Sequence, residues 1–85
     1  MSVTVEVTSE MSKALGVQRF EVEGASTVAD AVKLARERFR DGDFETLTSR
    51  AAVAVNGVLA NHRRGMKTKL SDGDTVSFVK AAAGG

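Results

Sequence analysis

Two residues stand out for the chemistry that their type and position allow, Gly84 and Gly85 at the C-terminal end of the sequence. Glycine has no Cβ, so a Gly-Gly end can enter a narrow channel and adopt backbone angles closed to other residues. The preceding side chains, of Ala81, Ala82 and Ala83, are too small to pack. Five extended residues reach roughly 16–18 Å. The pattern predicts a flexible tail over 81–85 that delivers the Gly85 carboxylate to another protein's active site.

Other reactive groups are scarce. The absence of cysteine excludes disulfides, thiolate nucleophiles, zinc–thiolate sites and iron–sulfur clusters. His62 is the only histidine, which leaves no histidine-based metal cluster and no support for a Ser-His-Asp triad. Asp72 and Asp74 lack the rest of a calcium loop, and with Gly73 between them they predict a turn instead. We therefore expect no cofactor and no metal on the chain itself.

Length and charge limit the range of functions. A chain of 85 residues suits one small domain with a thin core, so function is expected on a face, a loop or a terminus. The net charge of +1 predicts neither nucleic acid nor an anionic membrane as a partner. No run of about 18 apolar residues and no signal-peptide core is present, so we expect a cytoplasmic protein without a membrane span. One local basic segment indicates either a solvated loop or a docking patch for an acidic partner or an anion: His62, Arg63, Arg64, Lys67 and Lys69.

The first half of the sequence predicts two strands and one helix. Apolar and polar residues alternate from Val3 to Thr8 and from Arg19 to Glu23, which indicates two half-buried strands of a hairpin around a loop from Ser9 to Gly16. Thr27 is a typical helix N-cap with Asp30 three residues on. A single apolar stripe of the following helix contains Val28, Ala31, Val32, Ala35 and Phe39, and Gly42 stands at the expected helix end.

The second half predicts three more strands. Phe44 and Leu47 are expected to pin a connecting loop to the core. The apolar run from Ala51 to Val55 suits a central strand covered on both faces, and Asn56-Gly57 is a strong hairpin signal before a short return strand over 58–60. An irregular polar stretch over 61–69 and a final strand over 75–79 follow. The fold class is therefore α+β, a mixed sheet of about four to five strands with one main helix on one face.

Strand alternation assigns faces to the residues near the tail. Val76 and Phe78 share parity on the last strand and are expected under the helix. Val79 then points to the opposite face, where Val79 and Leu59 form a candidate exposed patch for partner binding. Ordinary core packing is the alternative for both residues. We expect a domain over 1–80 and a tail over 81–85.

Three stretches of the sequence resemble a known family. They are "VEGASTVADAV" (Val22 to Val32), "AVAVNGVLA" (Ala52 to Ala60) and "LSDGDTVSFV" (Leu70 to Val79), followed by the terminal Gly84-Gly85. Together they are similar to the ubiquitin-like β-grasp sulfur carriers of the MoaD/ThiS type. The longer first hairpin and the segment around Phe44 resemble the small subunit of molybdopterin synthase more than the shorter thiamine carrier. The alanines before the glycines depart from the prolines common in the molybdopterin branch.

This resemblance implies a mechanism and partners. A ubiquitin-activating-like adenylyltransferase would use ATP to adenylate Gly85, and a persulfide would then convert the adenylate to a thiocarboxylate. Gly84 would allow passage of the end, while Ala81, Ala82 and Ala83 would lie in the partner's channel. The acceptor would be the large subunit of molybdopterin synthase or another sulfur-accepting enzyme, so the chain would be a non-catalytic carrier subunit.

Three alternatives stay open at this stage. The sulfur could serve another pathway, such as thiamine, cysteine or tRNA thiolation. Gly85 could instead be joined to lysines of target proteins, as in ubiquitin. The chain could also be a plain interaction module whose Gly-Gly end is incidental, in which case one added residue after Gly85 would change nothing.

Overall fold

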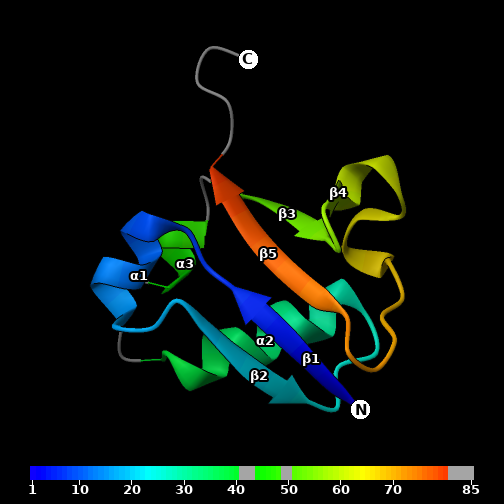
Figure 1. Cartoon of the computed structure of the whole chain (residues 1–85), viewed down its shortest axis with the longest axis horizontal. Helices are drawn as coiled ribbons and strands as arrows, with labels where there is room; N and C mark the ends of the chain where they lie inside the picture. Colours follow the sequence, from blue (N-terminus) through cyan, green and yellow to red (C-terminus); the bar gives the residue numbers. More distant parts are fainter. Residues whose placement is uncertain (41–43, 49–50, 81–85) are drawn as a thin grey trace.

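The computed structural model describes residues 1–40, 44–48 and 51–80, and Figure 1 shows how these segments are arranged. Within them, five strands form one mixed sheet in the order β2-β1-β5-β3-β4. In chain order the elements are β1 (Ser2–Glu6), α1 (Ser9–Leu15), β2 (Arg19–Glu23), α2 (Val28–Arg38), α3 (Phe44–Thr48), β3 (Ala51–Val55), β4 (Val58–Leu59), the 3₁₀ helices η1 (Ala60–His62) and η2 (Gly65–Lys67), and β5 (Thr75–Lys80). Only β1 and β5 are parallel neighbours. The predicted α+β class and mixed sheet are confirmed.

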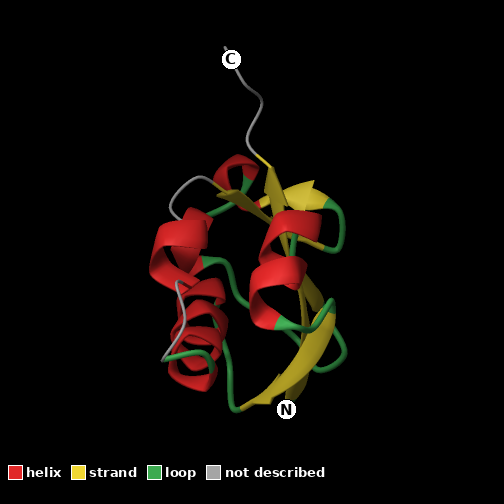
Figure 2. Ribbon diagram, turned by 90° about the vertical axis from the view of Figure 1, so that its left-hand side faces the viewer, coloured by secondary structure: helices red, strands yellow, loops and turns green. Residues whose placement is uncertain are grey.

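The core lies between one face of the sheet and the helices. Figure 2 views the molecule after a quarter turn, with most of the strands on one side and α2 and α3 stacked on the other. Val3 and Val5 of β1 are 0% and 1% exposed and point into this core. Val76 and Phe78 of β5 are 0% and 4% exposed, which confirms that they lie under the helices. The opposite face of the sheet, called the outer face below, carries no helix in the described part of the chain.

Helix α2 begins with the predicted cap. The Thr27 hydroxyl accepts a hydrogen bond from the Asp30 backbone N–H at 3.2 Å, and the Asp30 carboxylate accepts one from the Thr27 backbone N–H at 3.2 Å. This reciprocal arrangement satisfies backbone donors that the first helical turn would leave free. Ser26 donates to the same carboxylate, and its hydroxyl is the main reason that the pKa of Asp30 is lowered. Four stripe residues are buried, Val28, Ala31, Val32 and Ala35. Gly42 lies outside the described residues.

The prediction of a loop from Ser9 to Gly16 is wrong, because these residues contain helix α1. The Thr8 hydroxyl accepts from the Met11 backbone N–H at 3.1 Å and caps the helix at its start. Gly16, with φ of 80°, caps its end by donating to the Ser12 carbonyl. Met11 is 1% exposed, so burial of one side chain fixes the short helix on the core. Strand β1 ends at Glu6 because Thr8 already belongs to this cap.

Phe44 anchors the segment between α2 and β3, as predicted, but from a short helix rather than a loop. Its ring is 1% exposed and lies edge-on to Phe78, with ring centroids 5.7 Å apart. Phe39 stacks on the same ring at 6.2 Å, and Leu47 packs half-buried against the core. Aromatic contacts therefore join the end of α2, helix α3 and strand β5.

Two predictions for the second half need correction. The central strand is β5, and β3 lies between β5 and the edge strand β4. Residues 51–53 of β3 are only half-buried, while Ala54 and Val55 are buried, so the strand is not covered along its whole length. The return strand stops at Leu59, since Ala60 begins η1. The stretch over 61–69 is therefore not fully irregular, and it takes part in two 3₁₀ turns. Asn56 and Gly57 have φ of 50° and 86°, which confirms the predicted hairpin turn.

Candidate functional site

The candidate site begins where β5 ends. Gly84, Gly85 and the three alanines before them lie outside the described residues, so the structure places the strand from which they follow. That strand pairs with β1 up to Ser77 and with β3 up to Lys80, which lies opposite Ala51. Lys80 is thus held by the sheet at the end opposite to the N-terminus (Figure 1). The division into a domain over 1–80 and a flexible tail over 81–85 stays a prediction.

Val79 and Leu59 lie on the same face of the sheet, the outer face. Val79 is the partner of Ala52, while Leu59 is the partner of Ala54, and directly paired residues project from the same side. Ser77 also pairs with Ala54, which places all these positions opposite the core residue Phe78. Leu59 is 37% exposed and Val79 is half-buried. Their role in partner binding stays a prediction.

The four apolar residues form a continuous strip across three strands, called the outer-face strip below: Val79, Ala52, Ala54 and Leu59. Ala54 is 5% exposed yet stands apart from the core cluster under the helices. The sequence-based reading missed Ala52 and Ala54, because an all-apolar run also fits a strand buried on both faces. The signal that could have found them is the small size of the alternate residues in Ala51 to Val55.

The other half of the outer face is polar. The Ser77 hydroxyl donates to Glu6 Oε1 at 3.2 Å, and Arg19 Nη2 lies 3.7 Å from Glu6 Oε2. These three residues continue the row of Ala54 and Leu59 across β5, β1 and β2. An exposed ion pair of this kind adds little stability. It does, however, set a polar boundary beside the outer-face strip, so only the β3–β4 side of this face offers apolar contact.

The Asp72–Asp74 segment is a structural turn at the start of β5, as predicted. Asp74 accepts hydrogen bonds from the Ser71 backbone N–H at 2.7 Å and from Asn56 Nδ2 at 3.0 Å, and these bonds lower the pKa of its carboxyl group. The nearby Arg63 charge lowers that pKa further. Asp72 Oδ1 accepts from the Ser2 backbone N–H at 2.7 Å. Both carboxylates therefore hold β1, β5 and the Asn56 turn together, at the end of β5 far from the tail.

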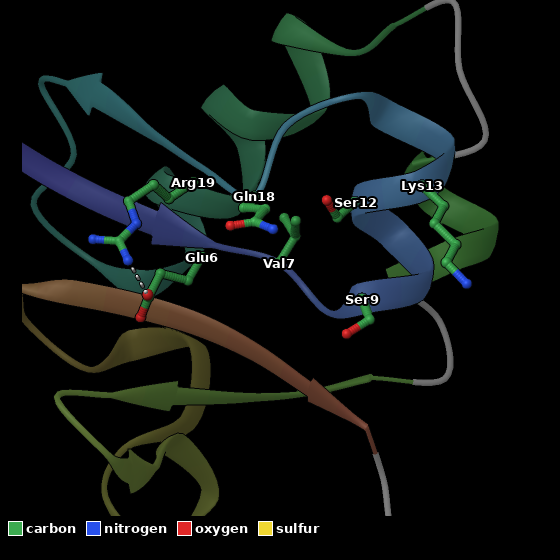
Figure 3. Close-up of a pocket in the computed structure, with 7 residues that line it drawn as sticks. All are labelled: Glu6, Val7, Ser9, Ser12, Lys13, Gln18 and Arg19. Atoms are coloured by element: carbon green, nitrogen blue, oxygen red, sulfur yellow. Dashed lines mark ion pairs between the residues drawn. The ribbon is translucent and has the colours of Figure 1, made fainter.

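A shallow depression beside α1 is the next place where polar side chains gather (Figure 3). Its lining consists of Glu6, Val7, Ser9, Ser12, Lys13, Gln18 and Arg19. Lys13 points away from the Glu6–Arg19 ion pair, and Glu6 already accepts from Ser77. The polar atoms thus do not converge on one point. Across the described ranges, no group of three His, Cys, Asp or Glu residues could hold a metal ion.

The described helices are all too short or too polar to cross a bilayer. The described fold is a ubiquitin-like β-grasp: a mixed sheet wraps one main helix, and its central strand leads directly into the C-terminal residues. The ThiS family model matches residues 5–85, and the chain belongs to this family. The class is that of the ubiquitin-like sulfur carriers, which confirms the MoaD/ThiS-type resemblance. No match was found among curated proteins.

Solved structures share this fold over nearly the whole chain. The small archaeal modifier protein 1 of Methanosarcina acetivorans is 21% identical with a TM-score of 0.79, covering 99% of this chain and 96% of that one. A chain of the BexX/CysO complex of Amycolatopsis orientalis is 24% identical with a TM-score of 0.78, covering 98% and 99%. A chain in the complex of subunits 1 and 2 of the molybdopterin-converting factor of Helicobacter pylori is 21% identical with a TM-score of 0.63, covering 100% of both. These likenesses define the fold.

Proposed function

We propose that this chain is a sulfur carrier that donates sulfur in molybdopterin biosynthesis, as the small subunit of molybdopterin synthase. The observation that carries the proposal is the extent of the family match, which runs through Gly84 to Gly85 rather than stopping at the end of β5. The molybdopterin assignment is supported by the full-length likeness to a chain in the Helicobacter pylori complex of molybdopterin-converting factor subunits. Its site of action is the cytoplasm.

The chemistry takes place at the Gly85 carboxylate. A carboxylate anion resists nucleophiles, so an adenylyltransferase partner first uses ATP to form the acyl-adenylate and release pyrophosphate. The terminal sulfur of a partner's persulfide then displaces AMP to give an acyl disulfide, and a second thiol of the partner cleaves its S–S bond, which leaves a thiocarboxylate on Gly85 and a disulfide on the partner. The chain supplies the narrow Gly84–Gly85 end, since a residue with a Cβ would widen it. The acid–base groups belong to the partners.

Docking on both partners uses the outer-face strip. A partner that accepts the tail must contact the surface around Lys80, and the nearest apolar residue on the outer face is Val79. From there the strip leads across β3 to Leu59, about 12 Å away by strand spacing and rise. Ala81, Ala82 and Ala83 then run into the partner's channel as a spacer. Apolar contact beside a threaded tail fixes the position of the carboxylate.

The test is incubation of the chain with ATP, a sulfur donor and the adenylyltransferase encoded in the same genome. Intact-mass measurement should show one oxygen replaced by sulfur. A variant with one alanine added after Gly85 is the matched control, because it keeps the fold and shifts the carboxylate by one residue. Transfer of the sulfur to a pterin precursor in the presence of the large subunit tests the pathway. An unmodified wild-type mass with an active adenylyltransferase would overturn the proposal.

A second candidate is a protein modifier, which the likeness to the small archaeal modifier protein of Methanosarcina acetivorans favours. In that case Gly85 forms an isopeptide bond with a lysine of a target protein. Digested lysates would contain lysines that carry the C-terminal residues of this chain. Other sulfur acceptors, in thiamine, cysteine or tRNA thiolation, share the thiocarboxylate step and differ only in the enzyme that consumes it.

A further inference from the structure

Positive charge is concentrated in one segment of the chain. The sequence has twelve Lys or Arg residues and eleven Asp or Glu residues. The segment from Asn56 to Lys69 holds four of the cations and none of the acids, so the remainder carries eight cations against eleven acids. A protein of net charge +1 is therefore strongly polarised. An uneven distribution of this kind orients a molecule as it approaches a charged partner.

The segment is a rigid frame rather than a loose loop. Arg63 and Thr68 donate backbone hydrogen bonds to Ala60 and Gly65 at 2.9 and 3.1 Å, which close η1 and η2. Thr68 is 4% exposed; its hydroxyl accepts from the Arg64 backbone N–H, and its carbonyl accepts from the backbone N–H of Val28 on α2. Buried side chains thus fix the backbone on both sides of the cations. A charged surface held in this way loses little conformational entropy when it binds.

The cations on this frame point to solvent, and we call them the basic loop: Arg63, Arg64, Lys67 and Lys69. Together with Thr68 they line a wide, shallow depression. The three ion pairs found in the described residues all lie elsewhere in the molecule. Arg63 is the member with an acidic neighbour, since its charge acts on the carboxyl group of Asp74. Most of the charge of the basic loop is therefore free for a partner.

We propose that the basic loop docks on a carboxylate-rich protein surface, and that this surface borders the channel that receives Gly84 and Gly85. The inference rests on the proposed function for the identity of that partner. The outer-face strip ends at Leu59, and η1 begins at the next residue, Ala60, so apolar strip and basic loop are continuous. The partner contacts apolar surface near the tail and carboxylates beyond β4. Charge guides the approach, and the strip and the tail supply the final fit.

A protein surface fits this region better than nucleic acid does. Proteins that bind single-stranded nucleic acid stack bases on exposed aromatic rings. The chain has four Phe and no Trp or Tyr, and the Phe side chains are buried or half-buried in the core. Its pI is about 8.2, below the strongly basic range of nucleic-acid-binding domains. Met66 is 47% exposed between the cations and offers apolar contact to a protein instead.

Carbodiimide cross-linking tests the inference on the unmodified chain, because this reagent joins an amine directly to a carboxylate with loss of water. The chain is mixed with the adenylyltransferase and the large synthase subunit from the same genome, and linked residues are mapped by mass spectrometry. We expect amide links from Lys67 and Lys69 to Asp or Glu side chains of a partner. Lys13 and Lys33 are also exposed and serve as internal controls on α1 and α2. Mapping separates these links from any formed by the Gly85 carboxylate.

Charge reversal tests the same contact through the rate of association with the partner. The double variant K67E/K69E should lower the association rate with the partner about tenfold at low salt, and added salt should shrink the difference. The variant K13E/K33E makes the same change in net charge away from the basic loop and should leave the rate within twofold. Equal effects of the two variants would overturn the inference, because net charge alone would then explain them.

The outcomes separate the two proposals. Thiocarboxylate formation together with links mainly from Lys13 and Lys33 refutes the basic loop and leaves the proposed function intact. Links from Lys67 and Lys69 without thiocarboxylate formation refute the carrier chemistry and support the docking surface. An absence of links from the basic loop overturns the docking inference. The same holds if the chain binds tRNA more tightly than it binds either protein and loses this tRNA binding in the K67E/K69E variant.

Discussion

Truncation of Leu59 to alanine should weaken partner binding at a modest cost to the fold. Leu59 is 37% exposed on the edge strand β4, so the free domain already buries the larger part of its side chain and leaves the rest for a partner. A partner seated on the outer-face strip would cover the exposed part. The adjacent Val58 is the matched control. It is 48% exposed, but its pairing with Val55 places it on the opposite face of the strand.

The size of the effect follows from the exposed area. Complete burial of a leucine side chain stabilises by about 1.5–3 kcal/mol. The part of Leu59 that remains for a partner to bury, 37%, then contributes about 0.6–1.1 kcal/mol. Since about 1.4 kcal/mol corresponds to a tenfold change in Kd, Leu59→Ala should weaken binding about threefold to sixfold. The part of the side chain that the free domain already buries predicts a loss of about 0.9–1.9 kcal/mol in the free energy of unfolding, which leaves the domain folded.

Titration calorimetry with the large synthase subunit, at fixed salt, measures the change in Kd, and urea unfolding of the free chain measures stability. Val58→Ala should leave Kd within twofold of the wild type. A loss for Val58→Ala that equals or exceeds the loss for Leu59→Ala would refute the assignment of the outer face as the docking face. A loss of stability for Leu59→Ala well above about 2 kcal/mol would refute the claim that its side chain is only partly buried in the free domain.

Three further predictions concern the fold. Thr27→Ala removes the N-cap of α2 and should destabilise the domain by about 1 kcal/mol, which lowers Tm by about 4–8 °C in calorimetry. Phe44→Ala empties a fully buried ring site and should cost about 3–5 kcal/mol, a large share of a small domain's stability, measurable by urea unfolding. The pKa of Asp74 is lowered below its ordinary 3.8 by the Ser71 hydrogen bond, so its stabilising effect is complete above pH 3.8 and is lost as the pH falls through the folded-state pKa. Asp74→Asn should therefore be less stable than the wild type at neutral pH, and the gap should close on acidification; a constant gap would contradict this reasoning.

Elements whose signals are local could be predicted from the sequence. Thr27 and Asp30 stand three residues apart, which is the spacing of a capping box, and they form one. Asn56 and Gly57 both adopt positive φ, as the hairpin turn requires. Helix α1 was missed because it spans only seven residues and depends on a tertiary contact, the burial of Met11. Short helices of this kind owe their stability to packing rather than to propensity.

The site was predictable in part. Alternation along β5 placed Val79 opposite Phe78, and the hairpin then placed Leu59 on the same face. The order of strands is not predictable from local patterns, and the prediction of β3 as the central strand is wrong because β5 holds that place. That order decides which residues lie between Val79 and Leu59. Ala52 and Ala54 therefore became visible as part of the outer-face strip only once the pairing of β3 with β5 and β4 was known.

Sulfur loading of Gly85 can be read from the intact mass of the chain after incubation with ATP, a sulfur donor and the adenylyltransferase. We expect a mass increase equal to the exchange of one oxygen for one sulfur, which fragmentation places on Gly85. The chain extended by one alanine should keep its mass. An unchanged wild-type mass, or sulfur found anywhere other than on Gly85, would show that the chain is not a carrier of this kind.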